Sequence, residues 1–133
     1  MPAAGPLLHL RRPLSFWGGV DPATGRITDP GNDGFDARIG GTILVIDVTR
    51  GSSSSSGILL ELIHRRLAPT AIGLGDPDAI LAVGALAGAA MGWPVPPVFQ
   101  VDPALLNDWP AGAPAQFDEV GAKLRIGWLQ APE

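Results

Sequence analysis

Hydrophobic positions in the middle of the chain predict a strand, a helix and a second strand in succession. Residues 42–48 form a continuous, largely β-branched apolar run, which is typical of a strand buried on both faces of a parallel sheet. From Ile58 onward, apolar side chains recur at every fourth position: Leu59, Ile63 and Leu67. Pro69 ends this helix, and residues 70–74 predict the second strand. A right-handed crossover is expected for such a unit.

The residues before this unit predict a hairpin followed by a loop. Residues 14–20 have the pattern of a short strand, residues 21–25 have turn chemistry, and residues 26–28 are expected to return as a paired strand. Residues 29–41 are rich in Gly and Asp and show no periodicity, which indicates a loop.

The residues after the unit predict a second helix and two more strands. The helix is expected over residues 76–91, and three glycines recur in it at every fourth position: Gly84, Gly88 and Gly92. Such a face lets another backbone come close, at a cost of roughly 1 kcal/mol per Gly relative to Ala. Residues 95–101 predict a strand, residues 102–118 a loop with one turn of helix, and residues 123–128 a final strand.

Together these elements predict an α/β fold, in which a parallel strand–helix–strand core is flanked by extra strands from both ends of the chain. The 133 residues are enough for one hydrophobic core, so residues 1–133 are expected to form a single domain. With 46% hydrophobic and 17% charged residues, the chain is globular rather than disordered. The net charge is -4 and the basic residues form no stripe, which argues against nucleic-acid binding. The chain has no cysteine and therefore no disulfide, iron–sulfur ligand or thiolate zinc site of its own.

One uncharged stretch, residues 79–99, is long enough to raise the question of a membrane span. It is mostly Ala and Gly and contains three prolines, so it predicts a helix, a turn and a strand instead. The first ten residues lack the basic start of a secretory signal. We therefore expect a cytoplasmic protein without a membrane interaction.

Five consecutive serines, residues 52–56, join the predicted strand over 42–48 to the helix that follows it. At the start of a helix the backbone amides lack intrahelical partners, and they attract a carboxylate, a phosphate or an alkoxide. Arg50 adds a fixed positive charge that suits a carboxylate. The alternative is that one serine caps the helix and the others are solvated filler. The run lacks the Gly-Lys-Ser/Thr ending of a P-loop, and the isolated His9 and His64 do not predict a metal site.

Several stretches resemble the small, swivelling subunit of the aconitase X type. They are residues 14–29, residues 50–56 with the sequence Arg-Gly-Ser-Ser-Ser-Ser-Ser, and the pairs Leu60-Glu61 and Ala68-Pro69. The resemblance covers most of the chain from about Leu14 to Val101.

The resemblance implies a swivelling β/β/α domain and a hydro-lyase, or dehydratase, in which a larger partner subunit holds an iron or iron–sulfur centre and most of a small carboxylate-bearing substrate. The small domain is expected to close over that site and to supply a serine base. Residue by residue, the resemblance assigns the base to Ser52, and contacts to the substrate or its oxyanion to Arg50, Gly51, Ser53 and Ser54. A serine can act in this way only where oriented N–H donors and positive charge stabilise its alkoxide. Without its large subunit, the chain is expected to be inactive.

Two positions depart from the family pattern. The family usually has a His-Pro pair in the loop after the first hairpin, where this chain has Asp29-Pro30-Gly31-Asn32-Asp33. It also tends to have Gly before the Arg-Gly-Ser sequence, where this chain has Thr49.

The family includes bacterial enzymes that act on cis-3-hydroxy-L-proline and archaeal ones that act on phosphomevalonate. The Ala, Gly, Pro and Arg bias of the chain is typical of a GC-rich bacterial genome and favours the hydroxyproline reaction. A phosphate-bearing substrate would favour more cationic groups than Arg50 alone near the serines. A non-catalytic module of the same fold, used for anion binding or assembly, is the alternative of a different class.

Overall fold

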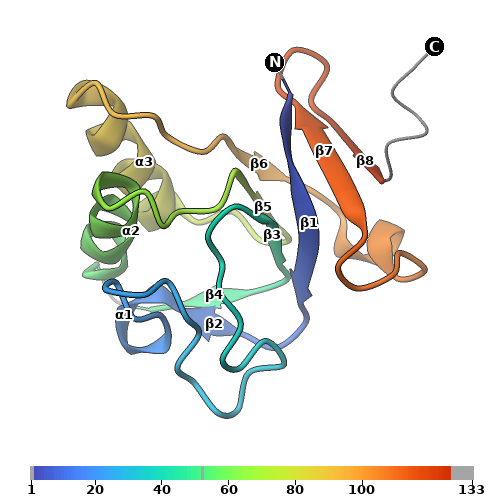
Figure 1. Cartoon of the computed structure of the whole chain (residues 1–133), viewed down its shortest axis with the longest axis horizontal. Coiled ribbons are helices and arrows are strands. Elements are labelled where there is room, and N and C mark those ends of the chain that lie inside the picture. The colour runs from blue at the N-terminus through green and yellow to red at the C-terminus, as the bar shows by residue number, and fades with distance from the viewer. Residues whose placement is uncertain (1, 52, 127–133) are drawn as a thin grey trace.

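The structure is a computed structural model that describes residues 2–51 and 53–126. Within these residues, a six-stranded sheet has the order β6-β5-β3-β1-β7-β8: β1 (Ala3–Leu10), β3 (Ile43–Ile46), β5 (Ala71–Leu74), β6 (Val98–Gln100), β7 (Pro114–Asp118) and β8 (Lys123–Ile126). Strands β1, β3, β5 and β6 are parallel, whereas β7 runs antiparallel to both β1 and β8 (Figure 1). The predicted α/β class with a parallel core is confirmed.

The first strand, β1, joins the two parts of the sheet. Its second half pairs with β3, from Leu7 opposite Ile43 to Leu10 opposite Ile46. Its first half pairs with β7 on the other edge. Residues 3–10 have no local pattern that predicts an element, and residues 114–118 lie within the predicted loop over 102–118, where the structure has strand β7. Strands β1 and β7 pair with each other although more than 100 positions separate them in the sequence. Local periodicity therefore does not reveal them.

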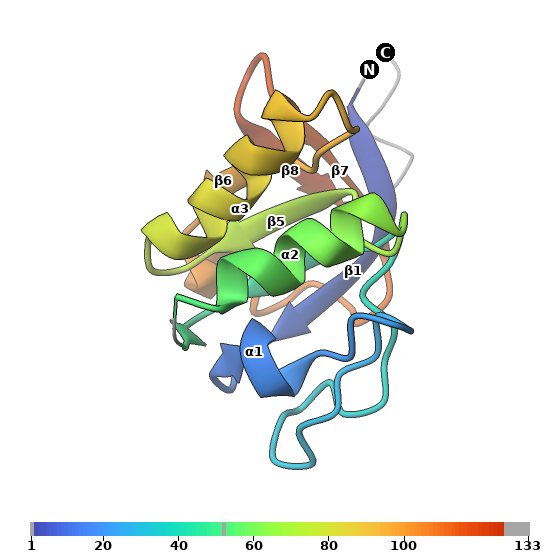
Figure 2. The ribbon, with the colours of Figure 1, turned by 90° about the vertical axis from the view of Figure 1, so that its left-hand side faces the viewer.

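Two helices cover one face of the sheet (Figure 2): α2 (Ser55–His64) and α3 (Ala79–Ala90). Apolar side chains from both helices and from this face of the strands form one buried core: Leu10, Leu44, Ile46, Leu59, Leu62, Ile63, Ile72, Leu74 and Leu81. The helix predicted to begin at Ile58 begins one turn earlier, because the Ser54 carbonyl accepts hydrogen bonds from the Gly57 and Ile58 amides. The helix predicted over 76–91 begins after Asp78, which caps it.

Glycines on α3 allow the two helices to pack closely. A Cβ atom on Gly84 would lie 2.7 Å from the backbone oxygen of Ser56 on α2. A Cβ atom on Gly88 would meet the side chains of Val95, at 2.9 Å, and Ile63. The prediction that this face admits a second backbone is therefore confirmed at Gly84.

The opposite face of the sheet has a smaller core around the short 3-10 helix η1 (Pro103–Leu106). Its buried apolar residues come from β1, β3, β5, η1 and β7: Leu7, Ile43, Val45, Ala71, Leu106, Ala115 and Phe117. The rings of Phe99 and Phe117 stack with their centroids 3.8 Å apart. No described helix is long and apolar enough to cross a membrane.

The strand predicted over residues 14–20 is wrong over residues 16–19. Residues Leu14–Ser15 form β2, which pairs in parallel with β4 (Thr49–Arg50), and Val20 makes an isolated antiparallel bridge to Ile27. The next residues form the short helical segment α1 (Phe16–Gly19), where Gly18 has a φ angle of 84°. The turn at residues 21–25 is confirmed by the Gly25 amide, which donates to the Asp21 carbonyl at 2.7 Å. The return strand is reduced to isolated bridges at Arg26 and Ile27.

Candidate functional site

The serine loop, defined as residues 50–56, connects the carboxyl end of the sheet to the start of α2. Strand β4 holds its beginning, because Ser15 pairs with Arg50 in the small two-stranded sheet. Helix α2 holds its end, with Ser54 at the N-cap position and Ser55 as the first helical residue. The predicted base, Ser52, lies outside the described residues.

The backbone at Gly51 strongly favours glycine. Its φ angle is +143°, a conformation that residues with a Cβ rarely adopt. A Cβ atom here would lie 2.6 Å from the Ser55 hydroxyl oxygen and 2.9 Å from that of Ser15. Any other residue at this position would therefore strain the chain where it leaves β4.

The last two serines of the loop make structural contacts. Ser55 is buried, and its hydroxyl oxygen accepts a hydrogen bond of 3.4 Å from the Trp17 amide. The Ser56 hydroxyl donates to the Ser53 carbonyl at 2.9 Å. Ser54 at the N-cap makes no side-chain capping hydrogen bond. The alternative interpretation, in which a serine side chain caps the helix, is therefore not met by Ser54 at the N-cap position.

The other predicted contact residues lie together at the exposed edge of the domain. Arg50, Gly51, Ser53 and Ser54 are all exposed. The first-turn amides of α2 and the Arg50 guanidinium bring partial and full positive charge to this edge. The loop is thus accessible to a second protein chain and can attract an anionic group.

Thr49, which stands where the family tends to have glycine, ties the loop to α3. Its hydroxyl donates a hydrogen bond of 2.5 Å to Oδ2 of Asp78. The other carboxylate oxygen, Oδ1, accepts from the Ile80 amide at 2.9 Å and from the Leu81 amide at 3.2 Å. This departure from the family pattern therefore joins the start of the serine loop to the start of a helix.

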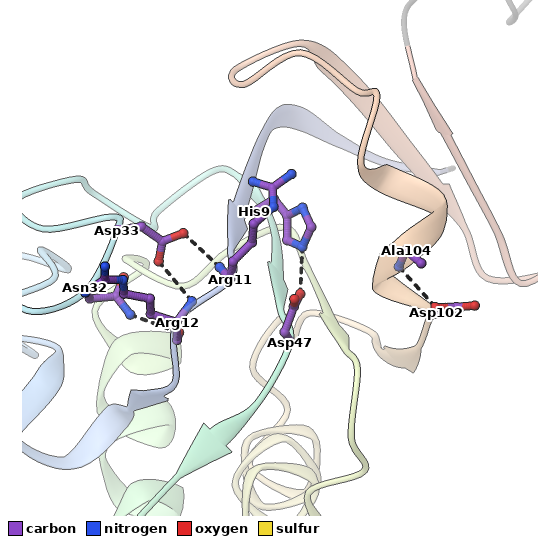
Figure 3. Close-up of polar contacts among 8 residues, drawn as sticks. All are labelled: His9, Arg11, Arg12, Asn32, Asp33, Asp47, Asp102 and Ala104. Atoms are coloured by element: carbon purple, nitrogen blue, oxygen red, sulfur yellow. Dashed lines mark hydrogen bonds and ion pairs between the residues drawn. The ribbon is translucent and has the colours of Figure 1, made fainter.

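The loop that lacks the His-Pro pair is fastened to the segment after β1 (Figure 3). Asn32 is buried, and its amide group donates to the carbonyls of Arg12 and Pro13, at 3.2 Å each. The Asp33 carboxylate accepts from the Arg11 and Arg12 amides, at 2.8 and 3.2 Å. In this chain, Asn32 and Asp33 thus make backbone contacts that position the loop.

A histidine–aspartate pair that no local sequence pattern predicts lies at the ends of β1 and β3 (Figure 3). Nε2 of His9 lies 2.6 Å from Oδ1 of Asp47, and the His9 side chain is only 6% exposed. In the sheet, His9 is in register with Val45, two residues before Asp47. The pair is therefore apparent only once β1 has been placed beside β3.

Across residues 2–51 and 53–126, no group of three or more His, Cys, Asp or Glu side chains could hold a metal ion. His64 is exposed on α2, and its ring lies 4.7 Å from that of Trp93. The described residues therefore do not fit an iron centre.

Comparison with known families identifies the family of this chain. A family model described as the aconitase X swivel domain matches residues 2–125. The chain belongs to the aconitase X swivel-domain family. The family resemblance expected from the sequence is confirmed.

Two relatives and one solved structure show how this swivel domain compares with other members. It is 45% identical over 84 residues to cis-3-hydroxy-L-proline dehydratase of Pseudomonas aeruginosa, covering 63% of this chain and 14% of that protein. It is 44% identical over 84 residues to the phosphomevalonate dehydratase small subunit of Pyrococcus furiosus, covering 63% of each chain. The chain thus matches less than two thirds of either relative.

The crystal structure of the holo-form of Thermococcus kodakaraensis aconitase X has the same fold. It superimposes with a TM-score of 0.79 and 32% sequence identity, covering 95% of this chain and 90% of that one. This swivel domain therefore shares with aconitase X the whole arrangement of sheet and helices.

Proposed function

We propose that this swivel domain, formed by the whole chain, is the small subunit of an aconitase-X-type dehydratase, a hydro-lyase, and that it supplies the base from its serine loop. The observation that supports this most is the loop itself. Arg50, Gly51, Ser53 and Ser54 are exposed where the chain enters α2, in a chain that belongs to the aconitase X swivel-domain family. Dehydratase subunits are among its relatives.

In this proposal, the Ser52 oxygen removes a proton from the carbon next to the substrate carboxylate. The electron pair of the broken C–H bond forms the new C=C bond, and the hydroxyl group on the next carbon leaves. The α2 amides and Arg50 lower the free energy of the negatively charged serine oxygen and of the charge that develops on the carboxylate. Gly51, Ser53 and Ser54 contact the substrate or its oxyanion.

The large subunit completes the site. We propose that it contains the iron or iron–sulfur centre and most of the substrate contacts, because the described residues here do not fit a metal. Such a centre supplies Lewis-acid activation of the departing hydroxyl. This chain alone is then expected to bind its partner but not to catalyse dehydration.

We propose cis-3-hydroxy-L-proline as the substrate. Around the serine loop, Arg50 supplies one full positive charge, which suits a single carboxylate. A phosphorylated substrate favours more cations at the same place. The sequence identities, 45% to the hydroxyproline enzyme and 44% to the phosphomevalonate subunit, do not separate the two substrates.

The test is to co-express the chain with an aconitase-X-type large subunit and to measure dehydration of both substrates. Co-purification followed by dehydration of cis-3-hydroxy-L-proline supports the proposal. Dehydration of phosphomevalonate alone supports the dehydratase class but rejects cis-3-hydroxy-L-proline as the substrate. If the chains do not co-purify, or if the complex dehydrates neither compound, the chain is a non-catalytic module of the same fold.

A further inference from the structure

A second polar site lies away from the helices, at the carboxyl end of β1. A hollow of about 480 Å³ opens here, within the range of small-molecule sites in proteins. Its walls come from β1, from the loop over residues 33–42 and from residues 109–112. The side chains that matter are Leu7, His9, Arg11, Asp33, Arg38 and Trp109.

The hollow contains a buried histidine with one unused ring nitrogen. Nε2 of His9 is bonded to Asp47, but Nδ1 is buried and has no hydrogen-bond partner among the described residues. A buried polar atom without a partner costs roughly 1–3 kcal/mol. A ligand that supplied the missing partner would recover this free energy, once a neighbouring side chain yields to admit it.

Two guanidinium groups in the same hollow are also without partners. Arg11 and Arg38 are exposed, and neither guanidinium makes an ion pair or hydrogen bond within the described part of the chain. By contrast, Arg26 and Arg65 each bond to a carboxylate. The Asp33 carboxylate also lines the hollow, and its two oxygens accept from the Arg11 and Arg12 backbone amides, but among the described residues it forms no ion pair with either guanidinium.

The remaining lining is apolar. Leu7 and the indole of Trp109 offer contact to a carbon skeleton, and the Thr42 hydroxyl is already bonded to the Ile39 carbonyl at 2.7 Å. The hollow thus combines two free cations, one unused histidine nitrogen and an apolar wall. Guanidinium groups bind carboxylates and phosphates in paired hydrogen bonds.

We propose that this hollow binds the carboxylate or phosphate group of a small organic molecule, held by Arg11 and Arg38, with Nδ1–H of the doubly protonated His9 ring donating a hydrogen bond to it. Asp47 is then a positioning residue, because its carboxylate accepts from Nε2–H, balances the charge of the imidazolium and orients Nδ1–H for the anion. The proposal concerns binding by this chain, and it does not depend on the dehydratase reaction.

The test is to add sodium phosphate or, separately, sodium acetate to the full chain at constant ionic strength. The ¹⁵N NMR signals of its two histidine rings report binding at each concentration. His64, which is exposed on α2, is the internal control. We expect the His9 Nδ1 resonance to shift and saturate while His64 does not move. If only phosphate saturates the shift, the natural ligand carries a phosphate group. If acetate saturates it, the ligand carries a carboxylate. If neither probe saturates, or if both rings shift in parallel, the proposal is wrong.

Three variants identify the residues that hold the probe. Arg11→Gln and Arg38→Gln should each raise the Kd by roughly tenfold or more, as expected for a lost hydrogen bond to a charged group. Arg65→Gln removes the same charge just after the end of α2, outside the hollow, and should leave the Kd unchanged. Both hollow arginines are exposed, so their variants should keep the fold, which the amide spectrum checks. Wild-type affinity in both hollow variants would contradict the proposal.

Discussion

Thr49 and Asp78, 29 residues apart, share a hydrogen bond of 2.5 Å that joins the start of the serine loop to the cap of α3. Asp78 serves both elements at once, because its second oxygen accepts from two amides of the helix. The bond therefore fixes the start of the serine loop to α3.

Removal of this carboxylate is expected to destabilise the domain. Asp78→Ala loses the helix cap and the bond to Thr49, and it should lower the free energy of unfolding by about 1–2 kcal/mol. Thr49→Val loses only the shared bond and should cost about 1 kcal/mol. Urea unfolding measures both, with the exposed Asp108→Ala as control. Equal stability of Asp78→Ala and Asp108→Ala would contradict this role.

Gly51 is expected to be essential for the shape of the serine loop. Gly51→Ala places a Cβ at a φ angle of +143° and against two serine hydroxyls, which should cost roughly 1–3 kcal/mol. The matched control is Gly57→Ala, because a Cβ there meets no atom within 4 Å and lies inside α2. That control should gain roughly 0.5–1 kcal/mol. If Gly51→Ala were as stable as the wild type, the backbone geometry described here would be wrong.

The close approach of α3 to α2 predicts a size limit at Gly84. Gly84→Ala puts a methyl group 2.7 Å from the Ser56 carbonyl oxygen, and it should destabilise by about 1–3 kcal/mol although Ala favours helices. Leu86→Ala on the same helix changes an exposed side chain and should stay within about 0.5 kcal/mol. A more stable Gly84→Ala would show that the helices can move apart freely.

The surface pair on α2 predicts a local titration effect. A hydrogen bond of 2.5 Å from Arg65, followed by the charge of Arg65, lowers the pKa of Glu61 from its ordinary value of 4.5. Because the pKa is depressed in the folded state, the pair stabilises the fold above pH 4.5, and this contribution is lost as the pH falls through the folded-state pKa. Carboxyl ¹³C NMR should show the Glu61 midpoint move back toward 4.5 in Arg65→Gln. An unchanged midpoint would exclude Arg65 as the cause.

The central elements of the fold could be predicted because their evidence is local. The strand at Ile43–Ile46 is a continuous apolar run, α2 has apolar side chains at every fourth position before Pro69, and α3 contains the regular glycine repeat. Strand β1 could not be predicted in the same way. Its residues mix Gly, Pro and His with apolar positions, and its pairing partners lie far away in sequence.

In the candidate site, too, local features could be predicted from the sequence and long-range contacts could not. The serine loop was predicted at residues 50–56 because its motif is contiguous and stands between a strand and a helix. The Thr49–Asp78 and His9–Asp47 contacts each join residues about 30 to 40 positions apart, so they required the sheet order. The segment at Phe16–Gly19 was mistaken for a strand because its apolar side chains fit either state, and Gly18 sets the turn.

The most direct measurement of the central proposal is the dehydration rate of the complex with Ser52→Ala in this chain. We predict that kcat falls by roughly 10²–10⁴-fold, the usual contribution of a general base, while the two subunits still co-purify. Ser53→Ala, which removes a neighbouring hydroxyl, should lose less. Full activity of both variants would contradict the assignment of a serine base to this loop.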